Sequence, residues 1–422
     1  MIALQPLLVV YLAVFVFSAG FRLALEAVNA GHVERYKGRV PAAFQGVIDP
    51  QDLARMDRYT LDRIRFAGIE SVAERALFLA ILLSGVLPWM TRVLEGWGPV
   101  GSGLAFFAAL GALFLLFNLP FDFHRTFTIE ARYGFNTSTR KLWVLDHLKS
   151  FVIAGILGGV LLALFLLLVA HAGPAWWVWA WAILIGFQFL MLVLYPTVIA
   201  PMFNTFTPVR DEAMVERIRA LAREQGVAVG AVLQMDAGRR SRHTNAYFTG
   251  LGRVKRIVLF DTLLQAHDPE EILAVLAHEM GHLKKGHVWK QVLIFGAASL
   301  VLLFAASRVM QWEGLYQAFG FSLTPAYAGL FLAGVLWEPV GFFLSPLSMA
   351  VSRRFEGEAD RFVHTTSVGG APLVRALKKM ARDNLSNLRP HPVYVRFHYS
   401  HPPLLERIHT LESLERRGAF NP

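Results

Sequence analysis

The segment DPEEILAVLAHEMGHLKKG, residues 268–286, predicts a helix with both of its ends marked in the sequence. Asp268 suits the N-cap, Pro269 suits the first helical position, and Glu271 stands where a capping box requires an acid. The closing Lys-Lys-Gly run is typical of a helix end or a kink. Residues 254–260, just before this helix, are β-branched and aromatic, so they predict a strand.

The same helix contains the pattern HExxH, as His278-Glu279-Met280-Gly281-His282. His278 and His282, four residues apart, project from one helical face, so both imidazoles can reach one metal ion. Glu279 lies about 100° further round the helix, where it can hold the water that completes the metal's shell. The pattern therefore favours a zinc peptidase over a helix that carries two surface histidines by coincidence.

A catalytic zinc ion usually takes three protein ligands and leaves a fourth position for water. Val288 stands where one class of zinc peptidases has its third histidine, six residues beyond His282. His287 is one residue short of that position and lies about 140° away from His282 around a helix. We expect His287 to be a polar residue near the membrane surface rather than a ligand.

A glutamate from a later helix is the other common third ligand. Glu356 and Asp360 share one helical face, so Glu356 could bind the metal and Asp360 could orient a ligating imidazole. Spacing alone leaves Glu358 as a rival ligand. It also leaves open an acidic surface that pairs with the neighbouring arginines.

The composition indicates an integral membrane protein, because 55% of the residues are hydrophobic, only 17% are charged, and mean hydropathy is +0.44. Long apolar stretches predict seven membrane spans, near residues 3–25, 73–95, 103–121, 150–171, 175–199, 290–310 and 327–350. The first is too long for a signal-peptide core, so we expect a retained anchor.

Basic residues are concentrated in the first and third loops, the long fifth segment and the C-terminal tail. The positive-inside rule therefore predicts an N-terminus outside and a tail and metal site in the cytoplasm. In this interpretation the net charge of +10 is explained by cytoplasmic loops that face anionic lipid. No nucleic-acid-binding motif accompanies the charge. The chain contains no cysteine, which excludes disulfides and thiolate metal ligands.

Taken together, the chain resembles the type-I CAAX prenyl endopeptidases, which are seven-span zinc metalloproteases of the gluzincin type. The likeness covers nearly the whole chain. It rests on an ordered set of motifs: Tyr59-Thr60-Leu61-Asp62, Gly134-Phe135-Asn136, Tyr195-Pro196-Thr197-Val198-Ile199-Ala200-Pro201-Met202-Phe203-Asn204, Asn245-Ala246-Tyr247-Phe248, HEMGH, Phe355-Glu356 with Ala359-Asp360, and Tyr399-Ser400-His401-Pro402-Pro403. The cysteine-free composition, rich in Ala, Leu, Gly and Arg, favours a bacterial member.

The resemblance implies a mainly α fold, in which seven membrane helices enclose a water-filled chamber closed by a cytoplasmic zincin-type domain with a small β-hairpin. It also implies one zinc ion per chain, with Glu356 as the third ligand. We expect four parts: residues 1–200 with membrane helices one to five, 201–289 with the zinc metalloprotease domain, 290–350 with helices six and seven, and 351–422 with the cytoplasmic part that completes the zinc site.

Residues 245–248 are expected to form the edge strand of a hairpin, which could pair with an extended peptide substrate or could be purely structural. The strand residues are Asn245, Ala246, Tyr247 and Phe248. The resemblance implies that His401 and Arg407 line the active site, where they could stabilise an oxyanion or hold a C-terminal carboxylate. His243 and His398 are expected to be structural.

The predicted function is hydrolysis of peptide bonds near the C-terminus of prenylated CAAX-type proteins, or of hydrophobic, membrane-associated peptides and proteins, with Glu279 as general base. The expected setting is a monomer in the bacterial inner membrane, without nucleic acid. A site-2-type intramembrane protease is an alternative, but its HExxH would lie inside an apolar span. A seven-span metal transporter or channel is another, but its ionisable residues would lie near the bilayer midplane.

Overall fold

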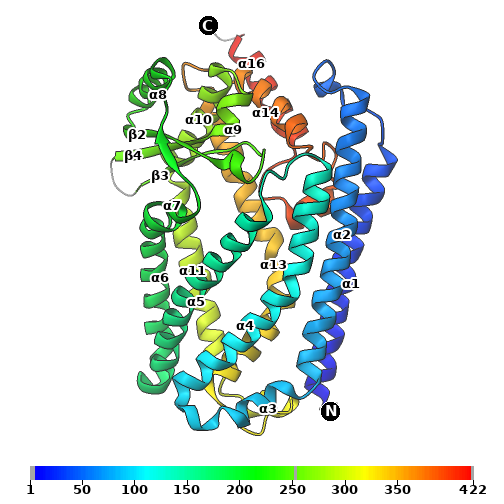
Figure 1. Ribbon diagram of the computed structural model, residues 1–422, viewed down its shortest axis with the longest axis vertical. Helices are drawn as coiled ribbons and strands as arrows, with labels where there is room; N and C mark the ends of the chain where they lie inside the picture. The colour runs from blue at the N-terminus through cyan, green and yellow to red at the C-terminus, as the bar shows by residue number, and fades with distance from the viewer. Residues whose placement is uncertain (1–4, 251–253, 420–422) are drawn as a thin grey trace.

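The computed structural model describes residues 5–250 and 254–419, and long helices dominate its architecture (Figure 1). The long apolar helices are α1 (Pro6–Arg35), α4 (Gly98–His124), α5 (Arg140–His171), α6 (Trp176–Leu194), α11 (His287–Val309) and α13 (Ala326–Val363). In this part of the chain, six helical segments are long and apolar enough to cross a membrane, and a bent pair adds a seventh. The prediction of about seven membrane helices is confirmed.

The bent pair consists of α2 (Pro50–Leu83) and α3 (Val86–Val93), which meet at an angle of 55°. The sequence predicted one continuous stretch over residues 73–95. The structure breaks it at Gly85, which has φ 83° and so adopts a left-handed conformation that glycine tolerates best.

Helix α13 is longer than the apolar stretch that predicted it. It continues without interruption through Pro339 and Pro346 to Val363, so the segment containing Glu356 and Asp360 is its last part rather than a separate helix. One helix therefore both crosses the membrane region and places acidic residues at the end of the molecule that contains the β-sheet. This end is called the polar end.

A small mixed sheet lies beside the ends of the long helices (Figure 1). Its strands are β1 (Phe206–Pro208), β2 (Ala228–Met235), β3 (Ala246–Thr249) and β4 (Val254–Phe260), in the order β1-β2-β4-β3. Strands β2 and β4 are parallel, whereas β3 pairs antiparallel to β4, with Ala246 opposite Leu259. The predicted hairpin is therefore present, and β3 is an edge strand.

Several shorter helices complete the polar end: α7 (Ala200–Phe203), α8 (Glu212–Glu224), α9 (Asp261–Ala266), α10 (Pro269–Lys284), α14 (Ala371–Asp383), α15 (Pro392–His398) and α16 (Leu404–Ala419). Helix α12 (Glu313–Ala318) belongs to the opposite end. In Figure 1 the sheet, α10, α14, α16 and the C-terminus gather at one end, whereas the N-terminus and α3 lie at the other.

One apolar core holds the polar end together. Ile218 of α8, Leu259 of β4, Met280 of α10 and Leu377 of α14 are buried in it, and Met56 of α2 joins them. Helix α10 is the central element of this core, and the predicted capping box of Asp268 and Glu271 is present at its start. The position of the HExxH motif is therefore fixed by burial on several sides.

A cavity of about 1480 Å³ lies among the long helices, lined by residues of α2, α4, α5 and α13. Its lining is mostly apolar but includes Glu338 of α13. Glu338 is paired with Arg22 of α1 at 2.8 Å and with Arg75 of α2 at 3.4 Å. Glu338 is thus paired, as the low dielectric of a membrane interior favours.

Replacing Gly281 by alanine should loosen the contact between α10 and α13. A Cβ atom at Gly281 would lie 2.9 Å from the Cα of Ala359 and 3.1 Å from the Cβ of Phe362, so one helix must move. We expect Gly281→Ala to cost about 1–3 kcal/mol and to lower the thermal unfolding temperature in detergent. Gly357→Ala on α13 is the control, because its Cβ would meet only the Arg361 side chain at 3.7 Å. Equal melting of the two variants would contradict the tight packing.

Candidate metal centre

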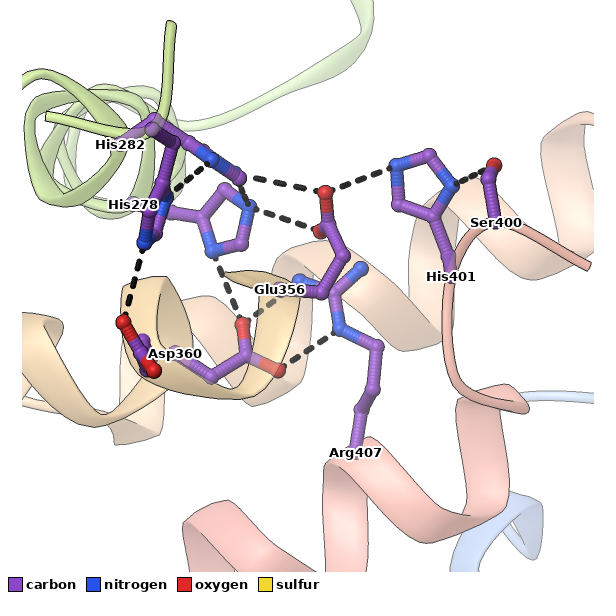
Figure 2. A network of polar contacts seen from close by, with 9 residues as sticks. His278, His282, Glu356, Asp360, Ser400, His401 and Arg407 are labelled. Atoms are coloured by element: carbon purple, nitrogen blue, oxygen red, sulfur yellow. Dashed lines mark hydrogen bonds and ion pairs between the residues drawn. The ribbon is translucent and has the colours of Figure 1, made fainter. Parts of the chain in front are cut away.

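Two helices bring three potential metal ligands together at the polar end of the molecule. His278 and His282 project from α10 toward Glu356 of α13 (Figure 2). The two histidine Nε2 atoms are 3.3 Å apart. Oε2 of Glu356 lies 3.3 Å from His278 Nε2, and Oε1 lies 3.4 Å from His282 Nε2. The predicted trio therefore shares one small space.

The spacing of these atoms fits a tetrahedral metal ion. Ligand atoms about 2.0–2.2 Å from an ion at tetrahedral angles are about 3.3–3.6 Å from one another. The two Nε2 atoms have that spacing from each other, and each has it from one oxygen of Glu356. Oε2 of Glu356 is buried without a hydrogen-bond partner in the described residues. A buried carboxylate oxygen left unpaired costs free energy, which coordination of a cation would recover. Two imidazoles and a carboxylate are also a donor set that zinc accepts.

In the absence of a metal ion, the groups around His278 favour a proton on its imidazole. Burial lowers the pKa of His278, but the neighbouring carboxylates of Asp360 and Glu356 outweigh it and raise the pKa to about 9. Without a metal the site thus keeps a proton on His278, and binding a metal ion releases it. Burial also raises the pKa of the Glu279 carboxyl above its ordinary value.

Asp360 and Arg407 support His278 from behind. Oδ1 of Asp360 lies 2.9 Å from Nδ1 of His278. Arg407 of α16 donates two hydrogen bonds to the same carboxylate, from Nε at 2.8 Å and from a terminal nitrogen at 2.7 Å (Figure 2). The bidentate pair holds Asp360 in one orientation, so the carboxylate can hold the imidazole of His278. The sequence prediction that Asp360 contacts an imidazole agrees with this geometry.

His287 supports His282 in a similar way, a contact that the sequence did not predict. His287 begins α11, at the edge of a candidate membrane span, and its side chain is buried, with a residue exposure of 1%. Its Nδ1 lies 2.9 Å from Nδ1 of His282, and its Nε2 lies 3.1 Å from Glu358. The ring also stacks on Phe355 with centroids 4.3 Å apart.

These contacts define a consistent arrangement of protons. A metal on Nε2 of His282 leaves the proton on Nδ1, which can be donated to Nδ1 of His287. His287 then carries its own proton on Nε2 and donates it to Glu358. Glu358, the rival ligand in the sequence, faces His287, Arg354 and Lys290 instead of the two motif histidines.

His401 lies on the open side of the trio. Its Nε2 is 3.3 Å from Oε1 of Glu356, and its Nδ1 is 2.9 Å from the hydroxyl of Ser400 (Figure 2). The side chain is 59% exposed, in contrast to the buried Arg407. Of the two residues expected to line the site, only His401 is therefore accessible to a substrate.

The expected substrate strand lies next to the motif helix, because β3 packs against α10. Ala246 is buried, whereas Tyr247 and Phe248 are partly exposed, and Asn245, directly before the strand, is exposed. His243, expected to be structural, stacks on Phe135 and hydrogen-bonds with Asn384 at 2.9 Å.

The chain is similar to known proteins along almost all of its length. The family model described as "CAAX prenyl protease N-terminal, five membrane helices" matches residues 29–205, and the model of peptidase family M48 matches residues 208–415. A CAAX prenyl protease 1 homolog from Oryza sativa subsp. japonica is 34% identical over 392 residues, covering 90% of this chain and 91% of the relative. CAAX prenyl protease 1 from Saccharomyces cerevisiae is 32% identical over 413 residues, covering 90% of each.

A solved structure agrees with these sequence relationships. The crystal structure of S. mikatae Ste24p superposes with a TM-score of 0.91 at 28% sequence identity. The match covers 97% of this chain and 99% of that chain. The shared fold thus extends over the membrane helices and the polar end alike.

Substitution of His287 should weaken metal binding without removing any of the three potential ligands. His287→Leu removes both contacts of the imidazole, so we expect the affinity for Zn²⁺ or Co²⁺ to fall by about 10- to 100-fold. His287→Asn can still accept a hydrogen bond from His282 and should lose less. The measurement is competition with a chromophoric chelator, together with the visible spectrum of the cobalt form. Wild-type affinity and spectrum in His287→Leu would contradict this role, and melting of the metal-free proteins checks that the fold is kept.

Proposed function

The chain belongs to peptidase family M48, with the N-terminal membrane region of the CAAX prenyl proteases, and on this basis we propose that His278, His282 and Glu356 bind one catalytic zinc ion. The protein is a multi-pass membrane metalloprotease that acts on peptides or proteins. The alternative of a metal transporter finds no support in these relationships.

The observation that carries the proposal is the close cluster of two imidazole nitrogens and the buried carboxylate of Glu356, which presents one oxygen to each of them. Zinc is the metal that this nitrogen and oxygen donor set suits in a peptidase, with a fourth position left for water. When bound, the zinc ion polarises the scissile carbonyl and makes a water molecule acidic enough to lose a proton near neutral pH.

In our proposal Glu279 is the general base. It accepts the proton of the attacking water and later delivers it to the leaving amine. Its burial supports the second step, because a carboxyl with a raised pKa holds the proton long enough to pass it on. His401 is exposed beside Glu356, so we assign it the stabilisation of the negative charge that develops on the carbonyl oxygen.

We assign Asp360 and Arg407 a positioning role. Asp360 holds His278, and both hydrogen bonds that Arg407 makes go to Asp360. The guanidinium is buried in this pair, so it is not free to hold a substrate. Arg407 thus acts through Asp360 and His278, rather than on the oxyanion or on a C-terminal carboxylate.

The substrate is proposed to lie along β3, beside Asn245, Ala246, Tyr247 and Phe248, as an added strand. The free edge of β3 and its packing against α10 support this placement. Backbone hydrogen bonds of this kind give affinity with little dependence on sequence, which suits a peptidase with varied substrates.

We propose that the substrates are prenylated CAAX-type proteins, or other hydrophobic and membrane-associated peptides, cleaved near the C-terminus. The names of the relatives and the mostly apolar 1480 Å³ cavity among the membrane helices support this class. The charge distribution of the loops supports an N-terminus outside and a zinc site in the cytoplasm. The cysteine-free composition supports a bacterial inner-membrane enzyme. We expect it to act as a monomer.

Glu279→Gln should abolish hydrolysis but keep the metal. The amide cannot accept the proton of the attacking water, so we expect kcat to fall by about 10²- to 10⁴-fold. The readouts are cleavage of a fluorogenic apolar peptide by the purified protein and its zinc content. Glu270→Gln on the same helix is the control, because that carboxylate is exposed and paired with Arg217. Retained peptidase activity in Glu279→Gln would reject Glu279 as the base.

Glu356→Gln should lose the metal itself. A neutral amide cannot replace the anionic oxygen between the two imidazoles, so we expect a large drop in bound zinc and no hydrolysis. Elemental analysis should find one zinc ion per wild-type chain and far less in the variant. Treatment of the wild type with phenanthroline should stop cleavage, and added zinc should restore it. A fully loaded Glu356→Gln protein would show that another residue is the third ligand.

A further inference from the structure

A second pocket, of about 660 Å³, lies next to the candidate metal centre. Its lining includes His401, which lies 3.3 Å from Glu356, and Arg407, which is paired with Asp360. The rest of the lining comes from α1, α2, α15, His243 and the segments after α14 and α15. The volume is that of a small-ligand site and is sufficient for a few amino-acid residues.

The two arginines of this pocket differ in what they are paired with. Arg407 is buried in the bidentate pair with Asp360, so its charge is already neutralised. Arg63 of α2 is exposed to the pocket, and in the part of the chain that the structure describes it forms no ion pair with a carboxylate. Its guanidinium carbon lies 5.4 Å from the ring centre of Tyr59.

The nearby carboxylates are hydrogen-bonded to groups other than Arg63. Glu130 accepts a hydrogen bond from the Tyr59 hydroxyl at 2.7 Å and lies 3.8 Å from His243 Nε2. Glu26, a carboxylate in the lining, accepts a hydrogen bond from the Tyr394 hydroxyl at 3.2 Å. Arg63 is near enough to Glu130 to interact with it electrostatically, but in the described residues no carboxylate oxygen lies within 4.0 Å of its guanidinium nitrogens. The guanidinium therefore keeps donors for an external anion.

On the side of α1 the lining of the pocket is held together by hydrogen bonds. Asn29 of α1 accepts a hydrogen bond from the backbone of His391 at 3.0 Å, and Tyr394 of α15 donates one to Glu26 of α1, so α1 and α15 are joined. This side therefore gives the pocket a fixed wall.

We propose that this pocket binds the C-terminal end of the substrate, and that Arg63 pairs with its terminal α-carboxylate. The inference rests on the proposed function, because the peptide must reach the pocket from the scissile bond. An arginine with no carboxylate partner matches a terminal carboxylate in charge and in bidentate geometry. Arg63 is thus a specificity-determining residue that directs cleavage to a site near the end of the chain.

The test compares one labelled apolar peptide with a free C-terminal carboxylate and the same peptide as its C-terminal amide. Binding is measured by fluorescence anisotropy to the zinc-loaded Glu279→Gln protein, which does not turn the peptide over. We expect the acid to bind about 10-fold more tightly than the amide, since a hydrogen-bonded charge pair is lost in the amide. Arg63→Gln in the same background should bind the acid and the amide equally.

Two further variants separate a specific pair from a general charge effect. Arg65→Gln removes a neighbouring exposed cation of α2 that does not line the pocket, so it should keep the preference for the acid. Arg63→Lys keeps the charge and should keep part of the preference. With Glu279 intact, Arg63→Gln should raise the KM for the acid peptide and change kcat little.

The outcomes also separate this inference from the proposed function. Equal binding of acid and amide by the parent protein, or an acid preference that survives in Arg63→Gln, overturns the assignment of Arg63. A zinc-loaded enzyme with intact Glu279 that cleaves neither peptide overturns the proposed peptidase function, while the binding comparison still decides the role of Arg63.

Discussion

The close packing of α10 against α13 is the contact on which the rest of this structure depends. Gly281 has no side chain, so the backbone of Ala359 can approach α10 closely enough for Glu356 to reach both motif histidines. The two helices are separated in sequence by a whole membrane segment, α11, and by α12. The metal site therefore exists only when the membrane helices and the polar end are assembled together.

Both motif histidines are held from behind by buried polar groups, and the two supports differ in kind. His278 is supported by a carboxylate that is itself paired with Arg407, whereas His282 is supported by a second histidine that leads to Glu358. Outer contacts of this type fix the tautomer and the ring direction of a metal ligand. Since desolvated charges are costly when unpaired, these supports also explain why acidic and basic residues are found in the core.

The long helix α13 links the membrane region to catalysis. Glu338 in its middle pairs with Arg22 and Arg75 beside the large cavity, and Glu356 near its end faces the motif histidines. The large cavity and the candidate metal centre thus share one helix. The two arginines of the smaller pocket differ in their pairing, because Arg407 is buried in an ion pair with Asp360 whereas Arg63 is exposed to the pocket.

Several secondary-structure elements of this protein could be predicted from local sequence alone. Capping residues, apolar periodicity and the HExxH spacing were sufficient for the motif helix, the membrane helices and the β3–β4 hairpin, because each depends on neighbours along the chain. The choice of Glu356 over Glu358 came from a family resemblance, since spacing does not say how α13 is rotated against α10. The contact of His287 with His282 was not predicted, because the separation of about 140° holds only within one continuous helix, whereas Gly286, with φ 63°, ends one helix and starts another. Which residues gather at the candidate metal centre, and which arginine is buried in an ion pair, was decided only by tertiary packing, because helix rotation and crossing are set by contacts between distant segments.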